Sequence, residues 1–161
     1  MARRIFISYR RDDTGAVAGR ISDRLQHLIG DANVFFDVST IGGGADFEQR
    51  ISAALATCDA AAVFIGDNWL GASPATGAPR IAEDGDYVRA EIRAAVARDI
   101  KVVPVLVGNA AMPTEAQLLA DIAALAKRNA MRLRHERFDD DSAALVKALT
   151  AEVAKRNKEA A

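Results

Sequence analysis

The chain has 161 residues, half of them hydrophobic, with a formal net charge of −1 and a single cysteine. This length fits one domain with a sizeable core, and the small charge gives no general attraction to nucleic acid or to an anionic membrane surface. One cysteine excludes an internal disulfide and favours a reducing compartment. No apolar run reaches transmembrane length. We therefore expect a cytoplasmic protein that binds neither nucleic acid nor membranes.

The first third of the chain alternates between strand and helix patterns. Residues 4–9 are β-branched and aromatic, which predicts a strand, and residues 10–15 predict a polar turn that ends in helix caps. Apolar residues at helical spacing then predict a helix that ends near residue 29. Residues 33–36 predict a second strand, with Asp37 at its C-terminal end. A glycine-rich loop follows over residues 38–45, and Asp46 is expected to cap a second helix.

The remaining residues continue the alternation. The apolar run 60–65 predicts a central parallel strand, and the long connection 66–85 is typical of a functional or mobile loop. Asp86 caps a predicted helix that ends near residue 99, and 101–107 predict a strand that Pro104 places near an edge or at a bulge. A helix is expected from Pro113 to about residue 125, then a charged edge strand over 131–134. Asp141 caps the last helix, and the polar segment 156–161 forms a tail after a domain of residues 1–155.

Five strands that alternate with five helices predict an α/β fold built from parallel units with right-handed crossovers. We expect a three-layer, flavodoxin-like, doubly wound five-stranded parallel sheet in the order 2-1-3-4-5. Such sheets bind ligands at the C-terminal ends of the strands, here between the first and third strands. The loop after the first strand carries Tyr9, Arg10 and Arg11. The connection after the third strand leads to Tyr87 and Glu91, so Glu91 is a candidate for the crevice although most helical glutamates are solvated.

Two other patterns resemble known kinds of site, but each lacks residues that such a site requires. Asp12, Asp13 and Asp67 resemble the phosphoacceptor pocket of two-component receiver domains, but the lysine expected after the fifth strand is missing, which favours capping and turn roles. The three glycines at 42–44 match neither a dinucleotide-binding nor a Walker A motif. They predict a flexible surface loop.

Four segments together resemble the TIR domain family, over about residues 4–153. Residues 6–12 (FISYRRD) are similar to its first box, residues 34–48 to its second strand and BB loop, and residues 58–65 to its third strand. Residues 86–92 (DYVRAEI) are similar to the segment that holds the catalytic glutamate of NAD-cleaving members. Tyr87 stands where many of these enzymes have tryptophan. The third box of animal receptors and a BB-loop proline are missing, which favours the bacterial-type branch.

The resemblance implies an NAD+ glycohydrolase or cyclase that releases nicotinamide and gives ADP-ribose or a cyclic form, with Glu91 as the catalytic residue and neither metal nor cofactor. The implied substrate-binding residues are Ser8, Tyr9, Arg10, Arg11, Asp37, Gly44, Phe47 and Tyr87, and Trp69 is a weaker stacking candidate. The family also implies self-association, or association with other TIR domains, through the BB loop at residues 37–47. A role in immune or antiphage signalling follows. The alternatives are a non-enzymatic TIR–TIR interaction module and, less favoured, nucleoside transfer.

Overall fold

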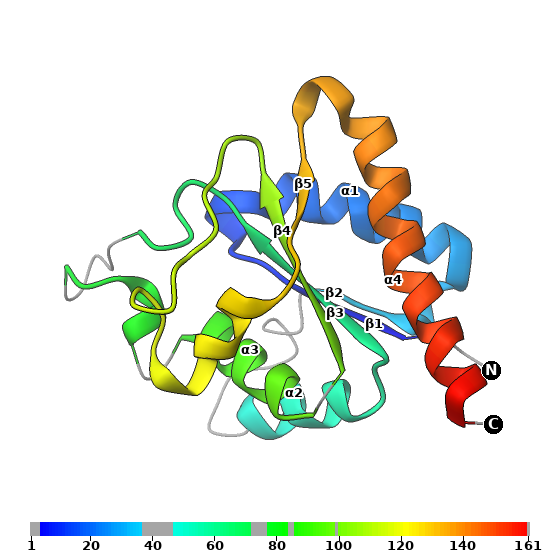
Figure 1. The fold of residues 1–161 in the computed structure, drawn as a ribbon, viewed down its shortest axis with the longest axis horizontal. Helices are drawn as coiled ribbons and strands as arrows, with labels where there is room; N and C mark the ends of the chain where they lie inside the picture. The colour runs from blue at the N-terminus through cyan, green and yellow to red at the C-terminus, as the bar shows by residue number, and fades with distance from the viewer. Residues whose placement is uncertain (1–3, 37–46, 72–76, 84–85, 99, 161) are drawn as a thin grey trace.

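A computed structural model of the chain describes residues 4–36, 47–71, 77–83, 86–98 and 100–160. Five parallel strands form one sheet in the order β2-β1-β3-β4-β5, which confirms the predicted order (Figure 1). The strands are β1 (Ile5–Ser8), β2 (Val34–Phe36), β3 (Ala60–Ile65), β4 (Lys101–Val107) and β5 (Met131–Leu133). The helices are α1 (Arg11–Ile29), α2 (Phe47–Ala56), α3 (Tyr87–Ala97) and α4 (Phe138–Ala160). Short 3₁₀ segments are η1 (Asp31–Asn33), η3 (Arg80–Ala82), η4 (Ala120–Lys127) and η5 (His135–Arg137).

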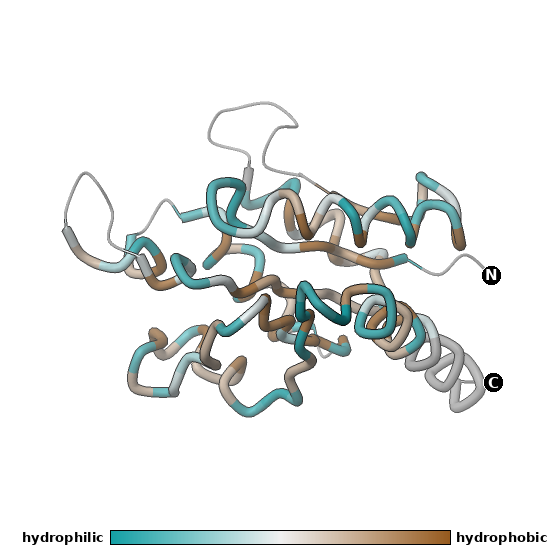
Figure 2. The backbone as a smooth tube through the Cα atoms, turned by 90° about the horizontal axis from the view of Figure 1, so that it is seen from above, coloured by the Kyte–Doolittle hydropathy of each residue, from teal (hydrophilic) through white to brown (hydrophobic). Residues whose placement is uncertain are grey.

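The sheet separates two hydrophobic cores, and Figure 1 shows α2 and α3 on one side of the strands and α1 and α4 on the other. In Figure 2, hydrophilic (teal) and hydrophobic (brown) residues alternate along the turns of the helices, as expected for helices with one face on a core. Side chains of α2, α3 and η4 form one core, and side chains of α1 and α4 form the other. Successive residues of a strand point to opposite faces. Accordingly, Phe6 of β1 lies in the α3 core, whereas Ile5 and Ile7 lie in the α1 core. All six residues of β3 are buried, as its apolar sequence predicts for a central strand.

Helix α1 begins earlier than the sequence predicts. The segment expected as a polar turn forms its first turn, where the N–H groups of Asp13 and Thr14 donate to the Arg10 carbonyl at 3.1 and 2.9 Å. Two aspartates in the first turn suit the positive end of the helix dipole, which explains why a polar stretch is helical here. Thr14 departs from helical geometry, with φ of −126°.

The expected helix over residues 113–125 is also different. The structure has a turn from Thr114 to Gln117 and then the 3₁₀ segment η4. Leu118, Ile122 and Leu125 are buried as predicted. Ile122 and Leu125 are three residues apart, which is the spacing that aligns side chains on a 3₁₀ helix.

Pro104 does not lie on an edge strand, because β4 runs between β3 and β5. It is in register with Val63 of β3 but precedes Val105, the first residue of β4 that is in register with β5. Pro104 thus lies where β4 extends past β5, and its missing N–H is tolerated there.

Helix α4 begins at Phe138, three residues before the predicted cap Asp141, and it runs through the segment expected as a tail to Ala160. Asp141 accepts hydrogen bonds from the backbone and guanidinium of Arg134, so it ties the end of β5 to α4. These hydrogen bonds lower the pKa of Asp141. No helix within the described ranges is long and apolar enough to cross a bilayer.

Candidate functional site

Ser8 and Glu91 meet at the point where the winding of the sheet reverses. Ser8 is the last residue of β1 and is in register with Val63 of β3. It lies on the same face of β1 as Phe6, toward α3. The Ser8 Oγ donates a hydrogen bond of 2.8 Å to Glu91 Oε1 from the second turn of α3. Glu91 is only 6% exposed, so its carboxylate is largely shielded from bulk water.

The sequence of α3 explains this position of Glu91. Asp86 is the N-cap, as predicted, and accepts a hydrogen bond from the Arg89 N–H at 3.2 Å. Val88, Ile92 and Ala95 are buried in the core and fix the rotation of the helix. Glu91 precedes Ile92 and so lies beside this apolar stripe rather than on the solvated face. A buried carboxylate requires a donor, and Ser8 supplies one.

Arg10 is buried and does not lie open to solvent. It is 2% exposed, and its Nη1 and Nη2 donate to the two carboxylate oxygens of Asp86 at 2.8 and 2.9 Å. Its Nε donates to the Trp69 carbonyl at 2.9 Å, and the guanidinium carbon lies 5.7 Å from the centre of the Trp69 ring. The Arg10 guanidinium thus already donates to three protein acceptors. These hydrogen bonds count against the expectation that it pairs with a pyrophosphate. Arg11, the first residue of α1, is exposed.

The aromatic candidates divide between surface and core. Tyr87 is 36% exposed at the start of α3, one turn before Glu91. Tyr9 is half-buried and stacks on Phe36, with ring centres 4.7 Å apart and planes 8° apart. Trp69 is fully buried, and its Nε1 has no hydrogen-bond partner within the described parts of the chain. Trp69 is therefore a core residue, which leaves Tyr87 as the exposed ring nearest to Glu91 in the sequence.

Two further aspartates hold the segments around the site. Asp13 accepts hydrogen bonds from the N–H groups of Gly66 and Asn68 at 3.0 and 3.1 Å. Asp12 accepts from Arg80 at 2.9 Å, and this contact lowers the pKa of Asp12. Both carboxylates are thus engaged in structural contacts, but not as the predicted helix caps, because Arg10 is the N-cap of α1 and both aspartates lie in its first turn. The described residues contain no group of three or more metal-ligating side chains.

Several expected site residues cannot be placed. Asp37, Gly44 and the other residues of 37–46 lie outside the described residues. Phe47 is the first residue of α2, but its side chain is also outside the described part of the structure.

Sequence reasoning missed the pairing of Arg10 with Asp86 and that of Asp13 with the loop after β3. The residues of the Arg10–Asp86 pair are 76 positions apart, so no local pattern connects them.

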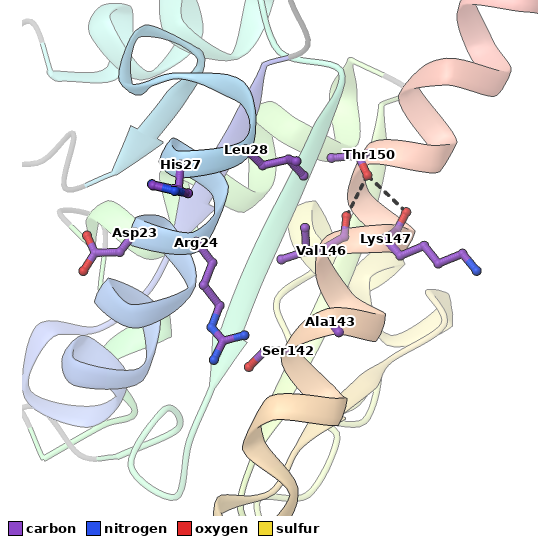
Figure 3. A pocket seen from close by; sticks show the side chains of 9 residues that line it. All are labelled: Asp23, Arg24, His27, Leu28, Ser142, Ala143, Val146, Lys147 and Thr150. Atoms are coloured by element: carbon purple, nitrogen blue, oxygen red, sulfur yellow. Dashed lines mark hydrogen bonds between the residues drawn. The ribbon is translucent and has the colours of Figure 1, made fainter.

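A cavity of about 750 Å³ lies between α1 and α4 (Figure 3). Leu28 and His27 of α1 and Val146, Ser142 and Thr150 of α4 line it. Helices α1 and α4 cover the opposite face of the sheet from α3. This groove is therefore separate from the Ser8–Glu91 pair.

Comparison with known proteins identifies the family. The structure superimposes on the TIR domains of the activated Roq1 resistosome, which directly recognises the pathogen effector XopQ, with a TM-score of 0.62 and 14% identity over 94% of this chain and 99% of that one. It also resembles the CMP N-glycosidase BcmB of Clostridium botulinum, with a TM-score of 0.48 and 14% identity over 89% of this chain and 97% of that one. No curated protein matches the sequence. The family model described as TIR domain matches residues 5–149, so the chain belongs to the TIR domain family.

Proposed function

We propose that this TIR domain cleaves the bond between nicotinamide and ribose in NAD+, with Glu91 as the catalytic residue. The observation that carries the proposal is the buried hydrogen bond between Ser8 Oγ and Glu91 Oε1, 2.8 Å long, at the C-terminal ends of β1 and β3. In this topology that position is the usual ligand crevice. Membership of the TIR family supports the choice of substrate.

The departure of nicotinamide requires no strong general acid from the protein. As the bond between ribose C1′ and the nicotinamide nitrogen breaks, its electron pair goes to the positively charged ring, and nicotinamide leaves as a neutral molecule. The ribose becomes oxocarbenium-like, as in glycoside cleavage. Water then adds to C1′ and loses a proton, which gives ADP-ribose; attack by a nitrogen of the adenine ring would instead give a cyclic form.

A carboxylate near C1′ stabilises the positive charge that develops there. Its effect is larger in a site that excludes water, because the local dielectric is lower. Glu91 is buried and accepts a hydrogen bond from Ser8, which holds its side chain in one orientation. Ser8 is thus assigned to keep the carboxylate aimed at the ribose.

The remaining contacts to NAD+ are assigned to groups around this pair. Tyr87 is exposed beside Glu91 and offers a ring for stacking on the nicotinamide or the adenine. Tyr9 lies beyond the end of β1 and is a second stacking candidate, although it also packs on Phe36. Arg11 is the cation that we assign to the pyrophosphate.

The loop at residues 37–47 is assigned to assembly. We propose that it binds a second TIR domain, which completes the site and makes activity depend on protein concentration. Asp37, Gly44 and Phe47 belong to this part of the proposal. The setting that we propose is cytoplasmic immune signalling, including antiphage defence.

The direct test replaces Glu91 with glutamine, which keeps an oxygen able to accept the Ser8 hydrogen bond but removes the charge. We expect nicotinamide release at saturating NAD+ to fall about 10²- to 10³-fold, as for the loss of other electrostatic groups in active sites. The matched control is Glu115→Gln, because Glu115 is exposed and its carboxylate forms a surface ion pair with Lys127 at 3.4 Å. Undiminished turnover by Glu91→Gln in an assembled protein would remove Glu91 from the chemistry.

The second candidate function is a non-enzymatic TIR–TIR interaction module. The tyrosine at position 87, where many NAD-cleaving members have tryptophan, favours it. Homotypic binding without NAD+ loss at any protein concentration would support this candidate over the first.

A further inference from the structure

Two hydrogen-bonded links join β1 to α3, and they lie side by side. The first is the Ser8–Glu91 pair, and the second is the fork between Arg10 and Asp86. Arg10 has extended backbone angles, with φ of −98° and ψ of 125°. The hydrogen bonds of Ser8 to Glu91 and of Arg10 to Asp86 show that both side chains point toward α3 and its N-cap.

The two links hold the start of α3 at two places. Ser8 and Arg10 are about 6.6 Å apart in an extended chain, at about 3.3 Å per residue. Asp86, the N-cap, and Glu91 are five positions apart, which corresponds to about 7.5 Å along a helix axis and about 140° around it. The core side chains of α3 fix its rotation, and the two links add two polar contacts that hold its first turns against the end of β1.

Asp86 serves the helix and the strand at once. Its carboxylate accepts both nitrogens of the Arg10 fork, and Oδ2 also accepts the Arg89 N–H as the N-cap of α3. The side chains of Arg10 and Asp86 are 1% and 9% exposed. Arg10 additionally holds the Trp69 carbonyl in the loop after β3. A single buried guanidinium therefore connects the end of β1, the loop after β3 and the N-cap of α3, the helix that carries Glu91.

We propose that Arg10 and Asp86 form a positioning clamp that sets Glu91 against the ribose, and that Arg10 is not a ligand for the pyrophosphate. This inference rests on the proposed cleavage of NAD+. It assigns Arg10 and Asp86 to the reaction through Glu91, without contact to the substrate. Misplacement of a catalytic group by about 1 Å can lower a rate about 10²-fold.

The test compares Arg10→Lys and Asp86→Asn with NAD+ and with nicotinamide riboside, which carries the same scissile bond but no pyrophosphate. Lysine at position 10 keeps the positive charge but cannot form the two parallel hydrogen bonds to Asp86. Asparagine at position 86 keeps an oxygen that can cap α3 but removes the charge that pairs with Arg10. We expect kcat to fall about 10²-fold in both variants and by the same factor for both substrates, with KM for NAD+ almost unchanged. The double variant should be no slower than the slower single variant, because the clamp acts as one unit.

The matched control is Arg80→Lys, which alters a nearby arginine–aspartate pair, Arg80 with Asp12, that is much more exposed. We expect it to leave both kcat values unchanged. The clamp would be overturned if Arg10→Lys raised KM for NAD+ while nicotinamide riboside turnover stayed at the wild-type rate, since this result identifies a pyrophosphate ligand.

A second readout does not depend on activity. The carboxyl ¹³C signal of Glu91, assigned by its loss in Glu91→Gln, reports whether the carboxylate has moved. We expect the signal to shift in Arg10→Lys and in Asp86→Asn but not in Arg80→Lys, with the helix content by circular dichroism preserved in all three. An unshifted signal in both clamp variants would overturn the clamp even if wild-type protein did not cleave NAD+, whereas an inactive wild type with shifted signals would count against the proposed function alone.

Discussion

Four polar residues at the site are buried or nearly buried, and they form two hydrogen-bonded pairs. Arg10, Asp86, Ser8 and Glu91 each have a specific partner, and three of the four are less than 9% exposed. A buried charge that loses its partner costs about 3–5 kcal/mol, far more than a broken surface pair. The geometry around Glu91 is therefore expected to resist small perturbations but to respond strongly to the loss of either clamp residue.

Burial raises the pKa of Cys58 and so lowers the reactivity of its thiol. It is 6% exposed, its thiol donates to the Ala54 carbonyl at 3.3 Å, and burial followed by the Asp59 charge raises its pKa to about 12. We expect the folded protein to react with iodoacetamide at pH 8 much more slowly than protein unfolded in guanidinium, because the thiolate is the nucleophile.

The raised pKa of Cys58 also makes the free energy of unfolding depend on pH. The folded thiol keeps its proton up to about pH 12, whereas an unfolded cysteine loses it near pH 8.5. Within that range the unfolded chain binds fewer protons, so the free energy of unfolding decreases as the pH rises. Cys58→Ala should remove this part of the pH dependence. Labelling of the folded protein as fast as that of the unfolded protein would contradict the burial of Cys58.

The start of α1 and the loop after β3 are held together by Asp13. Gly66 donates its N–H to the Asp13 carboxylate, and a Cβ at Gly66 would lie 2.7 Å from the Asp13 Cγ. The carboxylate cannot move away without losing its hydrogen bonds to Gly66 and Asn68. We expect Gly66→Ala to lower the free energy of unfolding by about 1–3 kcal/mol in urea titrations.

Gly19→Ala is the matched control for this prediction. Gly19 lies inside α1, and a Cβ there would meet its nearest neighbour, Phe36 Cζ, at an ordinary 3.8 Å. Alanine favours the helix more than glycine does, so this variant should gain about 0.5–1 kcal/mol. Equal destabilisation by the two variants would show that the Gly66 effect does not come from the Asp13 contact.

At the level of elements, the sequence predicts what is periodic and local. The five strands, their order and the Asp86 cap all follow from apolar spacing and capping residues, and the structure has them. The 3₁₀ form of η4 was not predicted because the spacing of Leu118, Ile122 and Leu125 is typical of an α-helix, whereas Leu118 lies outside η4 and only Ile122 and Leu125, three residues apart, belong to it. The Arg10–Asp86 pair was not predicted because its partners meet only through the topology.

On the scale of the whole molecule, the Ser8–Glu91 pair and the α1–α4 groove lie on opposite faces of one sheet. The Ser8–Glu91 pair lies toward α3, whereas the apolar groove of about 750 Å³ lies between α1 and α4. The approach of Ser8 to Glu91 follows from the strand order, because the end of β1 and the helix after β3 meet where the winding reverses. The α1–α4 groove does not follow from the strand order, since it depends on how two helices distant in sequence pack against each other.

Product analysis by mass spectrometry tests the central claim most directly. The full chain is incubated with NAD+ at increasing protein concentration, beside Glu91→Gln. We predict equal molar amounts of nicotinamide and of ADP-ribose or its cyclic form, rising more steeply than the protein concentration because assembly completes the site, and almost no product from Glu91→Gln. NAD+ that remains intact at every concentration of the wild-type protein, or equal product from Glu91→Gln, would contradict the account.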